Sequence, residues 1–293
     1  MRIALGPVSY SWPRESVMAF YERMLAQPLD VLYVGETVCS KRRELRVADW
    51  FELARGIAAS GRQAVLSTLT LIEAGSELNA VRQLCDNGEF LVEANDLAAV
   101  RLLSERRMPF VAGPGINIYS AATLARLVKL GLQRWVVPSE MSRSLLADLI
   151  EAARARELAV QTEVFGYGRL PLAYSARCFT ARYYNLPKDD CQLRCRDHPD
   201  GIAIRTQEGS DFLTLNGIQT QSGRVYSLID EWTDLRALGV STFRVSPQLD
   251  GSTEAAIAAL RQRLDGSTPT QPVPAATCNG YWHGQPGMLR LAG

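Results

Sequence analysis

The chain has 293 residues, of which 47% are hydrophobic and 22% charged, a composition ordinary for a globular protein. Lysine and arginine number 32 against 31 aspartate and glutamate residues, and the net charge of +1 excludes a global field that draws the chain to nucleic acid or an anionic membrane. The N-terminal residues contain no signal-peptide core, and no stretch has the roughly 18 uninterrupted apolar residues of a membrane span. We therefore expect a cytoplasmic protein.

Short, β-branched apolar runs alternate with segments of helical spacing along most of the chain. Most runs are continuously apolar, which is typical of parallel strands that are covered on both faces. We expect eight strands, at Arg2–Pro7, Val31–Glu36, Ala64–Leu69, Phe90–Glu93, Phe110–Ile118, Arg134–Pro138, Ala159–Phe165 and Phe243–Pro247.

The segments between the runs carry the pattern of amphipathic helices. From Trp50 to Ile57, apolar residues recur at i, i+3, i+4 and i+7, and Gly61 follows as a stop. Ser120 is expected to cap a second helix that ends at Gly131. Strand–helix alternation of this kind predicts an α/β fold, a (β/α)8 TIM-like barrel, with a doubly wound open sheet as the alternative.

One region interrupts the alternation after the seventh predicted strand. Residues 166–200 hold three of the six cysteines, and residues 201–225 read as short strands with turns at Gly209 and Gly223. The C-terminal segment 265–293 carries four prolines, which indicates irregular structure. We expect a single barrel domain over residues 1–293, with a cysteine-bearing loop and small antiparallel β insertion at 166–227 and an irregular tail at 265–293.

Four cysteines follow predicted strands. Cys39 comes directly after the second strand, and Cys178, Cys191 and Cys195 follow the seventh. Because the loops after all barrel strands emerge at one end, four thiols distant in sequence can meet there. Six basic residues near these cysteines would favour the thiolate form: Lys41, Arg42, Arg43, Arg177, Arg194 and Arg196.

Four thiolates suit either an iron–sulfur cluster or a zinc ion. Structural zinc sites usually contain two closely spaced cysteine pairs, and here only Cys191 and Cys195 are so spaced. Ligands spread over separate loops favour the bulkier cluster, while spacing alone leaves zinc and the absence of metal open. Cys85 lies in a predicted helix as a small buried residue, and Cys278 in the tail is expected to be an incidental thiol.

Five sequence segments resemble a known family. They read LYVGETVCSKRREL, LVEANDL, FVAGPGINIY, EVFGYGRLPLAYSARCFTARYYNLPKDDC and LNGIQTQ. The chain is similar in these segments to the collagenase-like peptidase family, in the branch that serves oxygen-independent ubiquinone biosynthesis. The resemblance runs from about Ile3 to the NGYWHG tail, and its most specific parts are GETVCSKR and the run from Leu170 to Cys195.

The resemblance implies a 4Fe–4S cluster on Cys39, Cys178, Cys191 and Cys195, with zinc reduced to an artefact of aerobic purification. It also implies a heterodimer with a UbiU-like paralogue that holds its own cluster. Together such proteins hydroxylate the aromatic ring of ubiquinone precursors without molecular oxygen, and prephenate is the oxygen donor considered for the wider family. The peptidase name is a legacy label for this branch.

The sequence and the resemblance together leave three possible functions. The first is a required subunit of an oxygen-independent hydroxylase, not an enzyme on its own. The second is a non-catalytic cluster-bearing partner that stabilises the catalytic subunit or passes electrons to it. The third is a peptidase, which the sequence disfavours because only His198 and His283 are available as bases and neither G-x-S-x-G nor H-E-x-x-H occurs.

Several polar residues near predicted strand ends are further candidates for a pocket at the barrel end. Glu36, Glu93, Asn117 and Glu163 occupy such positions, and Arg177 precedes a cysteine. The alternative is that the first four cap helices or brace loops, and that the arginine is an ordinary surface residue.

Overall fold

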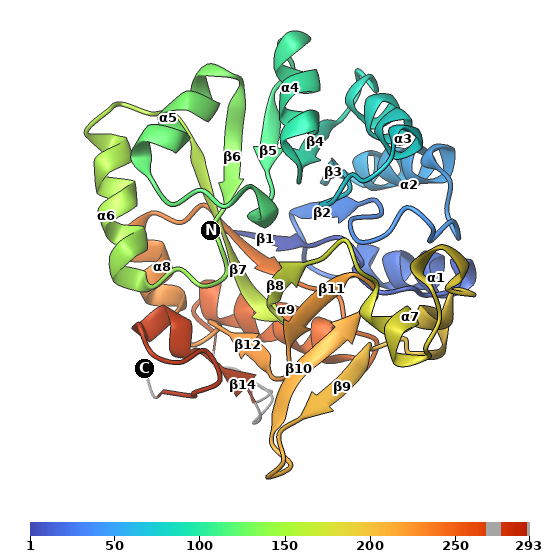
Figure 1. The fold of residues 1–293 in the computed structure, drawn as a ribbon. Helices are drawn as coiled ribbons and strands as arrows, with labels where there is room; N and C mark the ends of the chain where they lie inside the picture. The colour runs from blue at the N-terminus through green and yellow to red at the C-terminus, as the bar shows by residue number, and fades with distance from the viewer. Residues whose placement is uncertain (268–276, 292–293) are drawn as a thin grey trace.

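The computed structural model describes residues 1–267 and 277–291. Within this part of the chain, eight parallel strands form the wall of a barrel (Figure 1). The strand β13 (Thr242–Val245) pairs with both β1 (Arg2–Leu5) and β7 (Gln161–Gly168), which closes the barrel. The TIM-like barrel is therefore confirmed, and the open-sheet alternative is wrong. The strands are β1 (Arg2–Leu5), β2 (Val31–Val34), β3 (Gln63–Ser67), β4 (Leu91–Ala94), β5 (Phe110–Ala112), β6 (Leu132–Val136), β7 (Gln161–Gly168) and β13 (Thr242–Val245).

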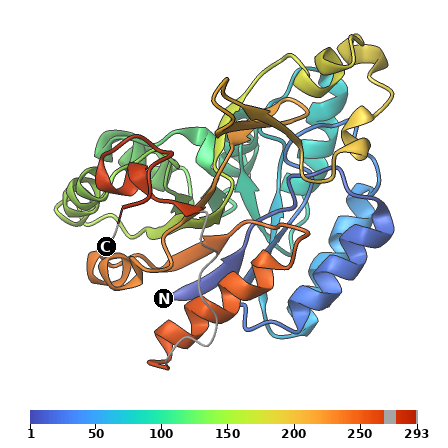
Figure 2. The same cartoon turned by 90° about the horizontal axis from the view of Figure 1, so that it is seen from below.

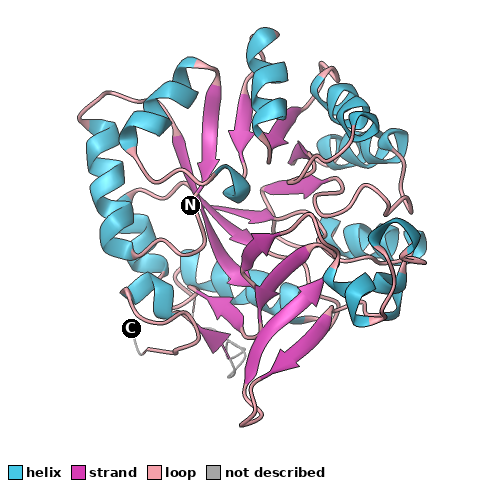
Figure 3. Cartoon of the chain, viewed as in Figure 1, coloured by secondary structure: helices cyan, strands magenta, loops and turns pink. Residues whose placement is uncertain are grey.

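Helices surround this ring of strands, as the colouring in Figure 3 shows. In α2 (Val47–Ala59) the residues from Trp50 to Ile57 at the predicted spacing are buried. Ser120 caps α5 (Ala121–Lys129) by accepting a 3.2 Å hydrogen bond from the Thr123 amide. Both helix predictions are confirmed. The helices of the barrel are α1 (Arg14–Leu25), α2 (Val47–Ala59), α3 (Gly75–Cys85), α4 (Leu97–Glu105), α5 (Ala121–Lys129), α6 (Arg143–Arg154), α8 (Trp232–Leu238) and α9 (Ser252–Leu264).

Burial on both faces explains the continuous apolar runs. Along β2, Leu32 and Val34 pack with the helices, while Val31 and Tyr33 belong to a second, smaller cluster with residues of other strands. Successive side chains of a strand point to opposite faces of the sheet. Because both faces are buried, each position holds an apolar residue or a polar residue with a hydrogen-bond or ion-pair partner. Strand β5 is shorter than predicted because Pro114 begins a 3-10 turn immediately after it.

The predicted insertion forms a separate antiparallel sheet at the barrel end away from the N-terminus (Figure 2). The segment 212–220, expected as one strand, is a hairpin, because Gly217 has a φ of +66° and turns the chain between β10 and β11. The insertion comprises β8 (Pro171–Tyr174), α7 (Phe179–Tyr183), 3-10 turns at Lys188–Asp190 and Arg194–Asp197, β9 (Ile202–Arg205), β10 (Asp211–Asn216) and β11 (Gln219–Ser222).

The last part of the expected insertion belongs to the barrel sheet instead. Strand β12 (Val225–Ser227) pairs with β7 antiparallel and with β14 (Thr277–Cys278) in parallel. The tail is therefore not wholly irregular, since it supplies this strand and a 3-10 turn at Gly280–His283. Three of its prolines, at 269, 272 and 274, lie outside the described residues. None of the helices in the described ranges is long and apolar enough to cross a membrane.

Candidate functional site

The four cysteines that follow predicted strands lie at the barrel end that carries the insertion. Cys39 lies in the loop after β2, and Cys178 is the N-cap of α7, where its Sγ accepts a 3.4 Å hydrogen bond from the Ala181 amide. Cys191 ends the first 3-10 turn of the insertion and Cys195 lies in the second. All four side chains are half-buried.

Two contacts hold the loop of Cys39 against the segment of the other three cysteines. The ammonium of Lys41 donates hydrogen bonds to the carbonyl of Lys188 at 2.7 Å and to Asp189 at 3.2 Å. Next to Cys195 in sequence, Arg196 pairs with Glu44. Segments about 150 residues apart in sequence are thus joined directly beside the cysteines, as the loop positions of a barrel predict.

Arg42 is the central polar residue of this region. Its side chain is only 2% exposed, and its guanidinium donates to the carbonyl of Ser9 at 2.6 Å and to Asn216 at 2.7 Å. The carboxylate of Glu36 lies 4.0 Å away. The buried Nε of Arg42 makes no hydrogen bond to any residue that the structure describes. Its position beside the thiols leaves this N–H available to a sulfur atom.

Burial dominates the electrostatics of two of the thiols. It raises the pKa of Cys39 to about 11, and Glu36 and Cys178 add to the increase. Burial likewise raises the pKa of Cys178, with contributions from Cys191 and Cys195. Cys178 thus acts electrostatically on Cys39, and Cys191 and Cys195 act on Cys178. Arg42 lowers the pKa of Cys39, as expected of a basic neighbour, but desolvation outweighs this effect, and at Cys178 burial likewise favours the thiol.

The remaining basic neighbours interact elsewhere. Arg194 lies over the ring of Tyr184 at 5.2 Å and pairs with Asp197, while Arg43 and Arg177 are exposed. For Arg177 the surface interpretation is the simpler one. Cys85 is buried at the end of α3, as predicted.

The donor set suits a thiophilic metal. Four thiols without carboxylate or imidazole ligands favour iron–sulfur clusters or zinc over magnesium or calcium. The buried and unpartnered Arg42 Nε also fits a site that carries negative charge. As the side chains stand, no three His, Cys, Asp or Glu residues among those described form a group that could hold a metal ion. The structure thus shows the placement of the donors and not their ligation.

The barrel interior holds a second polar group. Arg244 pairs with Glu163 at 2.6 Å and with Glu93 at 2.8 Å. Tyr33 donates a 2.6 Å hydrogen bond to Glu163, and Arg134 lies 3.4 Å from the same carboxylate. Burial opposes the ionisation of Glu163, but the two guanidinium groups outweigh it and lower its pKa below the usual value. Glu93 and Glu163 therefore build an ion-pair network and do not cap helices.

Two other candidates from the sequence lie in loops after barrel strands. Glu36 accepts hydrogen bonds from the amides of Val38 at 2.8 Å and Cys39 at 3.0 Å, which holds the loop that carries Cys39. Asn117 adopts a left-handed conformation with a φ of +55° and ends the 3-10 turn after β5. Glu36 therefore braces the loop of Cys39, whereas Asn117 ends its turn through its backbone conformation.

Sequence reasoning missed Arg42 and Arg244 as interior residues. Arg42 was seen only as one of several basic residues near a cysteine, and Arg244 lies within an apolar strand pattern. An arginine inside a strand of a two-sided sheet is a signal for a buried ion pair, because an isolated buried charge is strongly unfavourable.

The two histidines have partners that fit structural roles. The Nε2 of His198 lies 2.7 Å from the hydroxyl of Tyr184, and that of His283 lies 3.5 Å from Glu231. Across residues 1–267 and 277–291, neither histidine pairs with a serine or cysteine as in a nucleophile–base dyad.

Comparison with known proteins gives one family. The model of peptidase family U32 matches residues 17–271 of the chain. Among solved structures, dihydropteroate synthase from Thermus thermophilus is 14% identical, with a TM-score of 0.45 and coverage of 90% of this chain and 92% of that one. The enzyme from Burkholderia cenocepacia is 12% identical, with a TM-score of 0.48 and 91% coverage of each chain. At these values neither structure supports an inference about this chain.

Proposed function

The chain belongs to peptidase family U32, and from that premise we propose that it is the iron–sulfur subunit of a UbiU–UbiV type complex. In this proposal it takes the UbiV position, with a UbiU-like paralogue as its partner in the cytoplasm. The complex hydroxylates the aromatic ring of a ubiquinone precursor without molecular oxygen, and prephenate is the proposed oxygen donor. The cluster is a 4Fe–4S cluster bound by Cys39, Cys178, Cys191 and Cys195.

One observation carries the proposal. Two segments distant in sequence bring four half-buried thiols to the same end of the barrel. The Lys41–Lys188 hydrogen bond and the Arg196–Glu44 ion pair join these segments close in sequence to Cys39, Cys191 and Cys195. A cluster ligated from separate segments requires thiols that emerge at one end of the barrel, and these four cysteines do so.

Residues of this chain prepare the region for a negatively charged group. Arg42 contributes a buried positive charge and a free N–H, and Glu36 holds the backbone of the Cys39 loop through two amides. The raised pKa values of Cys39 and Cys178 mean that metal binding must displace protons from these thiols. A cluster with four thiolate ligands supplies electron transfer or structural support.

A peptidase mechanism has less support. The described residues contain neither a Ser–His nor a Cys–His pair, and the family name by itself assigns no nucleophile. A non-catalytic partner that stabilises the catalytic subunit or supplies it with electrons has the same four ligands. The two roles differ only in whether this subunit contacts the substrate.

Metal and sulfide analysis of protein purified without exposure to air tests the cluster. We expect a brown protein with about four iron and four sulfide per chain. Replacing Cys39, Cys178, Cys191 or Cys195 singly by alanine should abolish the absorbance and the iron. Cys85→Ala is the matched control, because this buried thiol lies in α3 outside the group. A colourless wild-type protein after anaerobic reconstitution would refute the cluster.

Co-purification tests the partner. Tagged protein from anaerobically grown cells should bring down a UbiU-like paralogue in equal amount, and hydroxylation of precursor should require both chains. A monomer that hydroxylates precursor unaided contradicts the subunit role without affecting the cluster assignment.

A further inference from the structure

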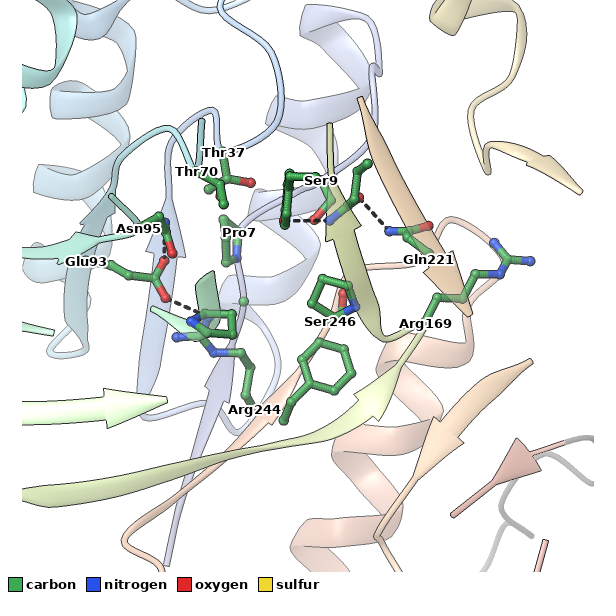
Figure 4. Close-up of a pocket in the computed structure, with 16 residues that line it drawn as sticks. Pro7, Ser9, Thr37, Thr70, Glu93, Asn95, Arg169, Gln221, Arg244 and Ser246 are labelled. Atoms are coloured by element: carbon green, nitrogen blue, oxygen red, sulfur yellow. Dashed lines mark hydrogen bonds and ion pairs between the residues drawn. The ribbon is translucent and has the colours of Figure 1, made fainter. Parts of the chain in front are cut away.

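A small pocket opens at the same barrel end, apart from the cysteines. It lies above the interior ion pairs, and Figure 4 shows Glu93 and Arg244 meeting at its base with Thr37, Thr70 and Ser246 around it. The small antiparallel sheet contributes residues of β8 and β11 to its lining. In barrels of this kind, ligands bind where the loops after the strands converge.

Each of the five segments singled out in the sequence contributes to this one pocket. Thr37, Asn95 and Pro114 come from the loops after β2, β4 and β5. Tyr174 comes from the cysteine-bearing run, and Gln221 from the LNGIQTQ segment. Segments that are separate in sequence and meet at one pocket are expected where a protein holds a ligand.

The pocket has hydrogen-bond donors without partners. In the described ranges the hydroxyl groups of Ser9, Thr37 and Ser246 make no hydrogen bond, although all three residues line the pocket. The Nη2 atom of Arg244 is buried and also lacks a partner. The carboxylate of Glu93 is already engaged by Arg244 and by a 2.7 Å hydrogen bond from Ser67. The three hydroxyls can donate or accept, whereas Arg244 Nη2 and the Nε of Arg169, which is also buried and unpartnered, can only donate, so the pocket offers donors to an acceptor group.

The net charge of the lining and the volume of the cavity restrict the class of ligand that the pocket can hold. The charged residues of the lining are Arg169, Arg244 and Glu93, which leaves one positive charge in excess. The cavity measures about 40 Å³, which holds a group of a few atoms and not an aromatic ring. Phe165 and Pro171 supply an apolar wall. A singly negative group with several acceptor lone pairs and a short apolar body matches all of these features.

We propose that this pocket binds the carboxylate end of a small organic acid, with the Thr37 and Ser246 hydroxyls as donors to its oxygens. The site is distinct from the cysteine group, and binding does not require a cluster. If the protein has no cluster, the pocket can still bind an acid. If the pocket binds no acid, the cluster assignment is unaffected.

Calorimetric titration of the full-length protein tests the proposal. Acetate, pyruvate and propionate are compared with acetamide, pyruvamide and propionamide, which keep the shape and remove the charge. We expect saturable binding of the acids and at least about tenfold weaker binding of the amides, since hydrogen bonds to a charged acceptor are stronger. Inorganic phosphate serves as the other anion and should bind more weakly than the acids. Equal affinity for acids and amides, or tighter binding of phosphate, would overturn the proposal.

Two variants test the named donors without breaking buried ion pairs. Thr37→Val and Ser246→Ala should each weaken binding of the acids about three- to tenfold while the protein remains folded. Ser144→Ala, on the exposed face of α6, is the matched control and should leave the affinity unchanged. Unchanged affinity in both pocket variants would contradict the assignment. Arg244 is unsuitable for this test because its removal leaves Glu93 and Glu163 without their counter-charge.

Discussion

The guanidinium of Arg42 donates a 2.7 Å hydrogen bond to the side-chain oxygen of Asn216, 174 residues further along the chain. This bond joins the loop that carries Cys39 to the hairpin of the small sheet. A second bond from Arg42 reaches Ser9 after β1, so three separate segments depend on one buried cation. Arg42 therefore links the loop of Cys39 both to the segment after β1 and to the small sheet of the insertion.

Replacing Arg42 by glutamine should destabilise the protein and loosen this region. The change leaves Glu36 without its nearby cation and removes bonds to Ser9 and Asn216. We expect a loss of about 3 kcal/mol in the free energy of unfolding, measured by urea denaturation. Arg43→Gln, at the exposed neighbouring position, should stay within about 0.5 kcal/mol of the wild type. Similar values for the two variants would show that Arg42 does not connect these segments.

Replacing Gly217 by alanine should disturb the same connection from the other side. Gly217 has a φ of +66°, and an added Cβ would lie 2.9 Å from Nη2 of Arg42. Gly209→Ala is the control, since that glycine has a φ of +82° with no atom near an added Cβ. We expect about 1 kcal/mol of destabilisation for Gly209→Ala from backbone strain and a clearly larger loss for Gly217→Ala, both by thermal unfolding. Equal losses would mean that the close approach of the added Cβ to Arg42 does not contribute to the destabilisation.

Replacing Glu163 by glutamine tests the ion-pair network of the barrel. The carboxylate is fully buried and faces both Arg244 and Arg134. Removing its charge leaves two buried cations with only Glu93 to balance them, and we expect a loss of about 3 to 5 kcal/mol. The exposed pair of Arg101 and Glu105 provides the comparison, and Glu105→Gln should cost less than about 1 kcal/mol. Chemical denaturation of both variants measures the difference.

The same carboxylate predicts a dependence of stability on pH. Since the pKa of Glu163 is lower in the folded protein than in the unfolded chain, its ionisation stabilises the fold above the unfolded value of about 4.3. This contribution is lost as the pH falls from there through the folded pKa. The difference in free energy of unfolding between wild type and Glu163→Gln should therefore shrink on acidification. A difference that is constant from neutral pH to about pH 3 would contradict the lowered pKa.

The strands could be predicted because each is an uninterrupted apolar run of a length suited to a covered parallel strand. All eight predicted runs contain or overlap an observed barrel strand, and β5 ends early only because Pro114 cannot continue it. In α6, Leu145 stands beside the buried Leu146 in an apolar run, yet it is 41% exposed. Which helical face is covered depends on neighbouring helices, and local spacing contains no information about them.

The strands of the insertion were harder to predict, because local sequence does not set where each strand ends and which strand it pairs with. The Asn216–Gly217 pair is a standard hairpin signal, yet continuous β-forming residues on both sides obscured it. The pairing of β12 with β7 and β14 could not be predicted, because strand partners are set by the closed sheet and not by the strand's own residues.

By itself the sequence determined the alternation of strands and helices, and with it the barrel end at which residues following the strands must lie. That rule follows from local apolar periodicity and the single direction of parallel strands. Only the tertiary structure decided which side chains meet there, such as Arg42 with Asn216 and Arg244 with Glu93 and Glu163. These contacts depend on the closure and twist of the whole sheet, since the partners are distant in sequence and acquire their burial only when all layers are packed.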